Sequence, residues 1–302
     1  SGAYGNGFHL ITMVVDRDAD TLKGYVDGAQ VGSAVSTLSV GSIASPGEDI
    51  YIGRGNTNWE GAIDDVRIYN TALSGTEIDA LYDDAQARLM AHLSLEDSTP
   101  EDVTGEGHDG TLNGDAYITT GQINNGVCLD GSGDTVTVAE SNDFDLGVAG
   151  SFTIAAWVRD DNDDSTNTWA NAVTKGNSRA IYGNTTAGSG FGMGRRGSVQ
   201  NRFAFGITDG TSTAKIETSS ALGTGFHHLV MVVDRVNGEL RAYVDGSQVG
   251  GSVDISSMGS LDSPYEDLVL GEGNGDWEGI IDEFRFYNYA LTGTQVNDLY
   301  NL

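Results

Sequence analysis

The chain has 302 residues, and its charge excludes several classes of partner. Acidic residues number 44 against 15 basic ones, which gives a formal net charge of −29. Such a surface repels phosphate backbones and anionic lipid, so no nucleic-acid partner is expected. No run of about 18 apolar residues occurs, which argues against direct membrane insertion. The single cysteine excludes an intrachain disulfide framework.

The acidic residues are mostly aspartate, with 31 Asp and 13 Glu, and only 3 of the basic residues are lysines. This balance is typical of a protein adapted to high salt. A calcium-rich extracellular domain has a similar composition, and the two interpretations are compatible.

Strand-like patterns follow one another along the chain. In the first 84 residues, Asp27-Gly28 predicts a tight turn, Ala62–Tyr69 a long strand, and the capping box Ser74-x-x-Glu77 a short helix. Further strands are predicted at 134–138, 151–159, 229–234, 239–245 and 280–287, and a last helix at the capping box Thr292-x-x-Gln295. Short strands separated by turn signals predict an all-β sandwich or jelly roll.

The chain contains a long internal repeat. Residues 1–84 align with residues 219–302 at a constant offset of 218 without a gap, and roughly half of the aligned positions are identical. Residues 85–218 occur only once. The natural unit is therefore a front half, 85–218, followed by a back half, 219–302. Residues 1–84 form a second back half that has no front half of its own.

A half-domain of this kind leaves one sheet face uncovered. Either the chain was cut from a longer tandem array, or another chain completes residues 1–84. We favour the tandem array, which also fits a chain that starts at Ser1 without a secretory leader.

Several ordered motifs resemble the laminin-G-like domains of bacterial and archaeal surface proteins. They are GVCLDGSGDTVTV (126–138), SFTIAAWVR (151–159), LRAYVDGSQVG (240–250) and LVLGEGNGDWEGIIDEFRFYNYALTGTQVNDLY (268–300). The resemblance implies the concanavalin A-like jelly-roll β-sandwich. It implies one complete domain, residues 85–302, preceded by the C-terminal half of another repeat, residues 1–84. Members of that family bind carbohydrate or protein, act as spacers, or accompany secreted glycoside hydrolases.

Calcium is the cofactor that the acidic loops favour, because hard cations bind several carboxylate and carbonyl oxygens. Candidate ligands in the early loops are Glu96, Asp102 and Asp130. Related jelly rolls place a calcium ion near the acidic residue of the last strand, here Asp282, which repeats as Asp64. The alternative is that Asp102 and Asp130 only cap turns through side-chain hydrogen bonds.

A carbohydrate site needs exposed aromatic rings beside polar groups. In the loops between residues 160 and 200, the candidates are Trp169, Tyr182 and the pair Arg195-Arg196. Guanidinium groups suit carboxylate-bearing sugars or an acidic partner. The alternative is that these arginines merely neutralise the acidic surface. Trp59 and Trp277 belong to a repeated N-x-x-W-E-G element and are interpreted as structural.

No catalytic constellation is predicted. Retaining glycosidases need two carboxylates about 5 Å apart, and the E-x-D-x-x-E pattern of related laminarinase-type enzymes does not occur. Asp282 and Glu283 are adjacent, so on a strand they would face opposite sides. We therefore expect a non-enzyme.

The sequence favours a calcium-stabilised adhesion or carbohydrate-binding module of a large secreted or surface repeat protein. Its expected location is extracellular or at the cell surface. The expected partners are a glycan or a cell-surface protein, and neighbouring repeats of the same chain or of another copy. Two alternatives are a structural spacer in a fibre or surface layer and an accessory module of a secreted glycoside hydrolase.

Overall fold

A computed structural model describes residues 9–44, 46–53, 59–61, 63, 66–86, 88–96, 99–162, 169–177, 188–197, 201–273 and 276–302. It divides into two compact units, Ser1–Gln86 and Ala87–Leu302. We call them the N-terminal unit and the C-terminal unit. Each is described by itself.

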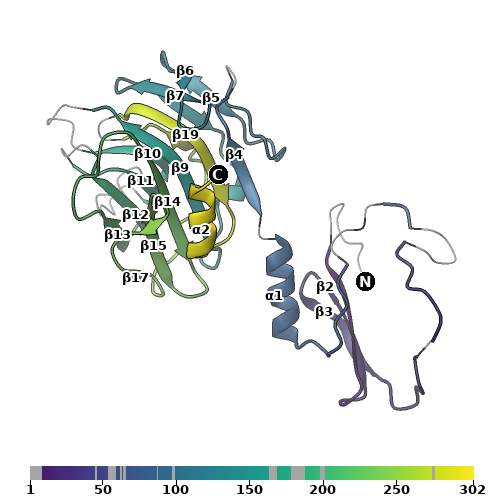
Figure 1. The fold of residues 1–302 in the computed structure, drawn as a ribbon. Helices are drawn as coiled ribbons and strands as arrows, with labels where there is room; N and C mark the ends of the chain where they lie inside the picture. Colours follow the sequence, from purple (N-terminus) through teal and green to yellow (C-terminus); the bar gives the residue numbers. More distant parts are fainter. Residues whose placement is uncertain are drawn as a thin grey trace. The chain divides into compact units, whose positions relative to one another are not determined.

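The described residues of the N-terminal unit form a small antiparallel sheet and one helix (Figure 1). Its elements are β1 (Ile11–Asp16), β2 (Thr21–Val26), β3 (Ala29–Ser36) and α1 (Gly75–Gln86), with sheet order β1-β2-β3. Asp27 and Gly28 both have positive φ, 51° and 77°, as a tight hairpin turn requires. Ile78 of α1 packs against Val14 and Tyr25, so the helix covers one face of this sheet.

The C-terminal unit forms two antiparallel sheets within the described residues (Figure 1). One has the order β13-β12-β11-β10-β18-β8-β5. The other has the order β16-β15-β14-β9-β19-β7-β6, and β17 pairs with β15 while β4 pairs with β19.

The strands of the first sheet are β5 (Gly110–Asn113), β8 (Thr135–Val138), β10 (Ala170–Gly176), β11 (Ser189–Arg195), β12 (Phe203–Asp209), β13 (Thr213–Glu217) and β18 (Leu268–Leu270). The strands of the second sheet are β4 (Leu89–Leu93), β6 (Tyr117–Thr120), β7 (Asn125–Asp130), β9 (Phe152–Asp160), β14 (Phe226–Asp234), β15 (Glu239–Val244), β16 (Ser247–Gln248), β17 (Val253–Asp254) and β19 (Glu278–Tyr287). A 3₁₀ turn, η1 (Asn142–Phe144), and a final helix, α2 (Gly293–Tyr300), complete the unit.

The central strand β9 is buried on both faces. Its even-numbered residues, such as Ile154 and Ala156, belong to the core between the two sheets. On the other face, Ala155 joins a second cluster with Val296 and Leu299 of α2. Trp157 lies against His228, with ring centroids 5.1 Å apart. The alternation of small and large apolar residues along β9 therefore serves a sandwich on one side and a helix on the other.

One of the three lysines lies inside the C-terminal unit. The Lys175 side chain is 1% exposed, and its Nζ forms an ion pair with Asp145 at 3.1 Å. The same Nζ donates to the carbonyl oxygens of Ser263 and Glu266, each at 3.0 Å. A buried ammonium group is tolerated because all of its hydrogen-bonding capacity is used.

The predicted all-β sandwich is confirmed, as are the strands expected at 134–138, 151–159, 229–234, 239–245 and 280–287, with small shifts of their ends. Both capping boxes form: Thr292 Oγ1 accepts from the Gln295 N–H at 3.3 Å, and Ser74 Oγ accepts from the Glu77 N–H at 3.3 Å.

The strand predicted at Ala62–Tyr69 is wrong, because none of the described residues between 59 and 70 lies in a strand. Its counterpart β19 pairs with β4, β7 and β9. The N-terminal unit has no such neighbours among its described residues, and a strand without partners leaves its backbone polar groups unpaired. No helix in the described part of the chain is long and apolar enough to cross a membrane.

Candidate functional site

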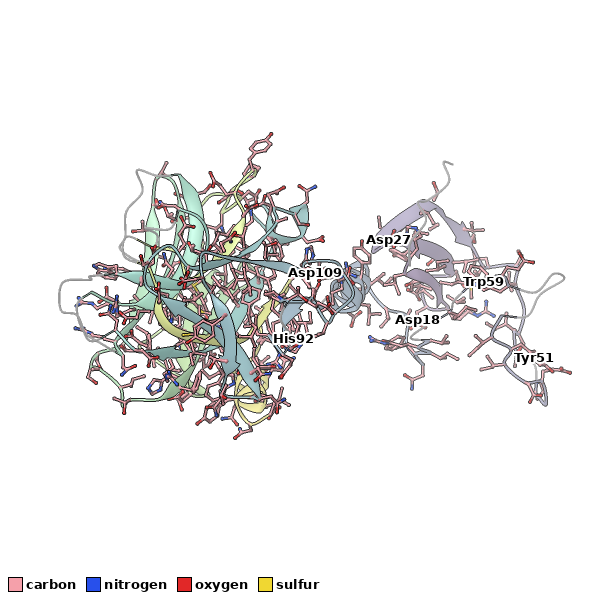
Figure 2. The ribbon with its side chains drawn as sticks, turned by 90° about the horizontal axis from the view of Figure 1, so that it is seen from above. Asp18, Asp27, Tyr51, Trp59, His92 and Asp109 are labelled. Atoms are coloured by element: carbon pink, nitrogen blue, oxygen red, sulfur yellow. The ribbon has the colours of Figure 1, made fainter. Side chains whose placement is uncertain are left out.

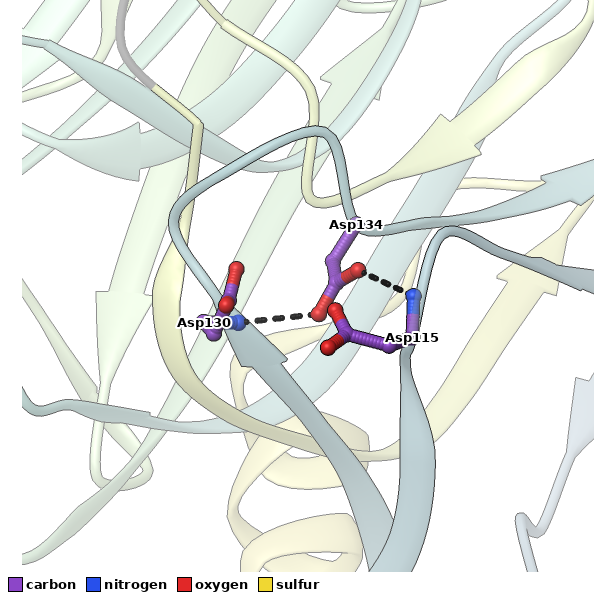
Figure 3. Close-up of side chains that lie close together, drawn as sticks. All are labelled: Asp115, Asp130 and Asp134. Atoms are coloured by element: carbon purple, nitrogen blue, oxygen red, sulfur yellow. Dashed lines mark hydrogen bonds between the residues drawn. The ribbon is translucent and has the colours of Figure 1, made fainter.

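Three carboxylates from two turns come together at one end of the C-terminal unit. Asp115 lies between β5 and β6, Asp130 ends β7, and Asp134 precedes β8. One oxygen atom from each lies within 4.8 Å of the others. Figure 3 shows the arrangement, in which Asp134 accepts from the N–H groups of Asp115 at 2.8 Å and Asp130 at 3.1 Å. We call these three residues the aspartate cluster.

The electrostatics of the aspartate cluster favour a cation. The pKa of Asp115 is raised, first by its hydrogen bond with the Asp134 carboxyl group and then by repulsion from Asp134 and Asp130. Among the described residues, no basic side chain forms an ion pair with any of the three. Asp276 approaches the same loop, where it accepts from the Gly133 N–H at 2.8 Å. A set of carboxylate oxygens of this kind can hold a metal ion, and it suits a hard cation.

Asp282 occupies a different place from the aspartate cluster. Its side chain is fully buried on β19, and Oδ2 accepts from the N–H groups of Gln122 at 2.9 Å and Ile123 at 2.8 Å. Burial raises the pKa of Asp282 to about 7, aided by repulsion from Glu283 and opposed by the Ile123 N–H. Oδ1 of Asp282 has no hydrogen-bond partner among the described residues.

Glu96 binds the same turn, residues 121–125, that donates hydrogen bonds to Asp282. Oε1 of Glu96 accepts from Asn124 Nδ2 at 3.1 Å, and the Glu96 carbonyl oxygen accepts from Asn125 Nδ2 at 2.9 Å. The structure therefore brings Glu96 and Asp282 to one turn, residues 121–125, and places Asp130 elsewhere. Asp64 lies outside the described residues.

Asp102 accepts hydrogen bonds from its own loop and from β4. Its carboxylate accepts from the backbone N–H groups of His92 at 3.0 Å, Thr104 at 3.1 Å and His108 at 3.1 Å, and from the Thr104 hydroxyl at 2.7 Å. Burial would raise the pKa of Asp102, but these hydrogen bonds lower it. Its environment is the one that the turn-capping alternative describes.

The adjacent carboxylates Asp282 and Glu283 serve separate partners. Glu283 accepts from His92 Nε2 at 3.0 Å and pairs with Arg285. Burial would raise the pKa of Glu283, but the hydrogen bond from His92 and the charge of Arg285 lower it. Glu283 lies at a bulge in β19, with φ at 51°.

A second group of side chains lies where β10 begins and β11 ends. The Arg196 guanidinium carbon lies 5.8 Å from the centroid of the Trp169 ring, and Arg196 Nε donates to Glu217 at 2.7 Å. Lys215 pairs with the other oxygen of Glu217 at 2.9 Å. We call Trp169, Arg196, Lys215 and Glu217 the aromatic–arginine rim. It presents a partly exposed ring and charges of both signs.

The two neighbouring arginines have different surroundings. Arg195 is 1% exposed and pairs with Asp160, which is also buried, at 3.6 Å. Burial raises the pKa of Asp160, with hydrogen bonds from backbone N–H groups and the charge of Arg195 opposing it. Arg196, whose side chain is 33% exposed, lies at the surface. Both arginines were candidates for ligand binding, but only Arg196 lies at the surface, because successive residues of a strand face opposite sides. Tyr182 lies outside the described residues.

Two members of the aspartate cluster, Asp115 and Asp134, were not among the ligands predicted from the sequence. Both follow a glycine with positive φ, Gly114 at 73° and Gly133 at 81°, in turns that join neighbouring strands. A signal was present in the pairing pattern, since β5 pairs with β8 and β6 with β7, so that the turns after β5 and β7 meet. That pairing could not be read from one segment alone.

The two-layer antiparallel sandwich and its sequence motifs define the class of protein. The model of the concanavalin A-like lectin/glucanases superfamily matches residues 3–79 and 130–297. The chain belongs to this superfamily. No curated protein sequence is similar enough to count as a match.

Solved structures of low identity share the fold. Domain 4 of AbnA, a GH43 extracellular arabinanase from Geobacillus stearothermophilus in complex with arabinotriose, is 19% identical at a TM-score of 0.55; the match covers 71% of this chain and 99% of that one. The binding domain of Paraclostridial Mosquitocidal Protein 1 is 16% identical at a TM-score of 0.58, with 70% of this chain and 52% of that one covered. The Botulinum Neurotoxin serotype G binding domain is 18% identical at a TM-score of 0.56, and the match covers 70% of this chain and 50% of that one. The match thus spans about half of each toxin domain.

Proposed function

We propose that the C-terminal unit is a non-catalytic carbohydrate-binding module. The observation that carries the proposal is the aromatic–arginine rim. A partly exposed indole beside a guanidinium group offers stacking for a sugar ring and paired hydrogen-bond donors for a carboxylate. Glu217 orients Arg196, so the donor is held in place before a ligand arrives.

Two of the solved structures that share the fold contain a bound ligand. One neighbour is the domain of an arabinanase bound to arabinotriose, and another, the Botulinum Neurotoxin DC binding domain, was solved in complex with SialylT. The shared fold by itself does not carry their ligands over to this chain. An adhesion or accessory role in the extracellular space or at the cell surface, in high salt, is part of the same proposal.

The test is binding of a glycan panel that contains neutral arabino-oligosaccharides and acidic, sialylated or uronic oligosaccharides. We expect acidic sugars to bind. Trp169→Ala and Arg196→Ala should each weaken binding about tenfold, which corresponds to about 1.4 kcal/mol.

Two matched variants control for nonspecific effects. Tyr265→Ala removes a ring that is 93% exposed, beside Glu266 at the other end of β10. Arg88→Ala removes an exposed arginine that pairs with Glu106. Neither should change affinity. A panel without any bound sugar would overturn the proposal and favour a structural spacer.

We further propose that the metal is calcium and that the aspartate cluster holds it. Bound calcium would neutralise the repulsion among the three carboxylates and fix the turns after β5 and β7. At about 100 times its Kd, it would add about 2.7 kcal/mol of stability. In a domain of this size, the melting midpoint would rise by roughly 5–10 °C.

The measurement is thermal unfolding at low salt, with calcium or with a chelator. Asp130→Asn should abolish most of the calcium-dependent rise. Asp254→Asn, at an exposed turn where the carboxylate accepts from Ser256, should leave the rise intact. An unchanged midpoint with and without calcium would refute the metal site. The sugar-binding proposal is tested independently by the glycan panel.

A further inference from the structure

The N-terminal unit contains an apolar groove of about 670 Å³ along β1. One wall is β1, with Ile11 and Met13. The other is the segment that follows β3, with Ile63, Val66 and Ile68. On the same segment, Trp59 and Tyr51 project from the ribbon in Figure 2 and are more than half exposed. An exposed apolar groove of this kind indicates an interaction surface.

The C-terminal unit has the same two walls, and there a strand lies between them. At the offset of 218, β1 corresponds to β14, and residues 60–69 correspond to β19. In the C-terminal unit, β9 pairs antiparallel with both. Ile154 of β9 lies opposite Met231 of β14 and opposite Phe286 of β19. The counterparts of Met231 and Phe286 are Met13 and Ile68, which both line the groove. No strand among the described residues of the N-terminal unit pairs with the other edge of β1.

Two residues that line the groove are exposed, whereas their counterparts in the C-terminal unit are buried. Met13 is 72% exposed and Met231 is fully buried. Ile68 is 73% exposed, whereas Phe286 is fully buried. The groove is thus lined by residues whose counterparts lie in the interior of the β-sandwich.

The rest of the back half is already formed in the N-terminal unit. His9 Nδ1 contacts Asp27 at 2.8 Å, as His227 Nδ1 contacts Asp245 at 2.8 Å. Arg17 donates to the carbonyl oxygen of Gly41, as Arg235 donates to that of Gly259 at 2.7 Å. The hairpin and the helix side of the unit are therefore preorganised, which lowers the entropic cost of adding a strand.

We infer that this groove is the docking site for the front half of a laminin-G-type repeat like residues 87–218. Its strand equivalent to β9 would add to the free edge of β1 and place an apolar residue between Met13 and Ile68. Addition of a strand to an exposed edge is an established mode of recognition. A second folded copy of this chain is a poor donor, because its β9 is already paired along both edges.

The test joins residues 87–218 directly before Ser1 of the full chain, which reproduces the spacing of the C-terminal unit without a linker. Hydrogen–deuterium exchange of residues 9–16 is then compared between the extended chain and the original one. We expect exchange of the amides at the free edge of β1, which do not bond to β2, to slow by at least 100-fold in the extended chain. In the original chain these amides should exchange fast.

The matched variant is Met13→Asp, which should leave the original chain unchanged because Met13 is exposed there. In the extended chain, it should abolish the protection of residues 9–16. Equal exchange in the extended and original chains would overturn the inference. A dimer of the original chain in sedimentation, dispersed by Met13→Asp and protected at residues 9–16, would also overturn it and assign the groove to a second copy.

Discussion

The two units of this protein contain copies of one 84-residue segment, identical at roughly half of their positions, in different surroundings. In the C-terminal unit, residues 278–287 form the ten-residue strand β19. In the N-terminal unit, no described residue between 59 and 70 lies in a strand. Trp277 is fully buried, whereas its counterpart Trp59 is 57% exposed. The interpretation of both tryptophans as structural therefore fits the burial of Trp277 alone.

The difference separates local from nonlocal determinants of structure. Turn residues, the two capping boxes and the His–Asp contacts form in both units, because each depends on residues close in sequence or in one hairpin. The strand at β19 forms only where partner strands from the front half exist. Strand propensity is thus a property of the paired surface, which is how β-sheet propensities behave in general.

The largest expected effect comes from replacing two equivalent methionines, Met231 and Met13, with aspartate. Met231→Asp buries an unpaired charge in the core and should cost more than about 4 kcal/mol. Met13→Asp, at the equivalent exposed position, should change stability by less than about 0.5 kcal/mol. Urea unfolding followed by tryptophan fluorescence, with Met→Leu controls at both positions, measures the costs. Equal costs would mean that the two units share one packing environment.

A second effect comes from Asp282. Its pKa in the folded protein, about 7, exceeds its ordinary value of 3.8. The folded state therefore binds the proton more tightly than the unfolded state, and stability falls as pH rises from about 4 to 7. Asp282→Asn removes this loss and should stabilise the C-terminal unit by up to about 4 kcal/mol at pH 8. Urea unfolding with chelator at pH 4 and pH 8 measures it; an unchanged pH slope would contradict the expected burial.

The smallest effect concerns His228, which is leucine at the equivalent position 10. Burial, with the charge of Arg285, lowers the pKa of His228 to about 4. Because the ordinary value is 6.5, the unfolded state binds the proton more tightly, and stability is lost as pH falls through this window. His228→Leu should stabilise the protein by about 2 kcal/mol at pH 5 and little at pH 8. Thermal melts at pH 5 and pH 8 compare the variant with the unmodified protein. The control is Leu10→His, for which we expect a smaller pH dependence.

Much of the fold was predictable because its signals are local. The alternation along residues 152–158 predicts β9, and Asp27-Gly28 predicts the tight turn between β2 and β3. The pairing of β9 with both β14 and β19 is not encoded in any single segment, so the fate of residues 62–69 could not be read from their own pattern.

The candidate sites were predicted less completely for the same reason. Asp130 was identified, and Asp134 lies four residues further on in the same turn between β7 and β8. Asp115 comes from the turn between β5 and β6, which only the sheet pairing brings beside them. That only one of Arg195 and Arg196 would be exposed was predictable, since neighbouring residues on a strand point to opposite faces. Which of the two faces inward depends on Asp160, a partner 35 residues away in sequence.

The buried Lys175 has a consequence for chemical labelling. The chain contains only three lysines, and the side chain of Lys175 is 1% exposed. Amine-reactive dyes or cross-linkers at neutral pH therefore reach Lys23 on β2 and Lys215 on β13, apart from the terminal amine. Each unit carries one reactive lysine by nature. The unmodified protein thus offers a built-in pair of attachment points, one per unit, for energy-transfer or cross-linking measurements.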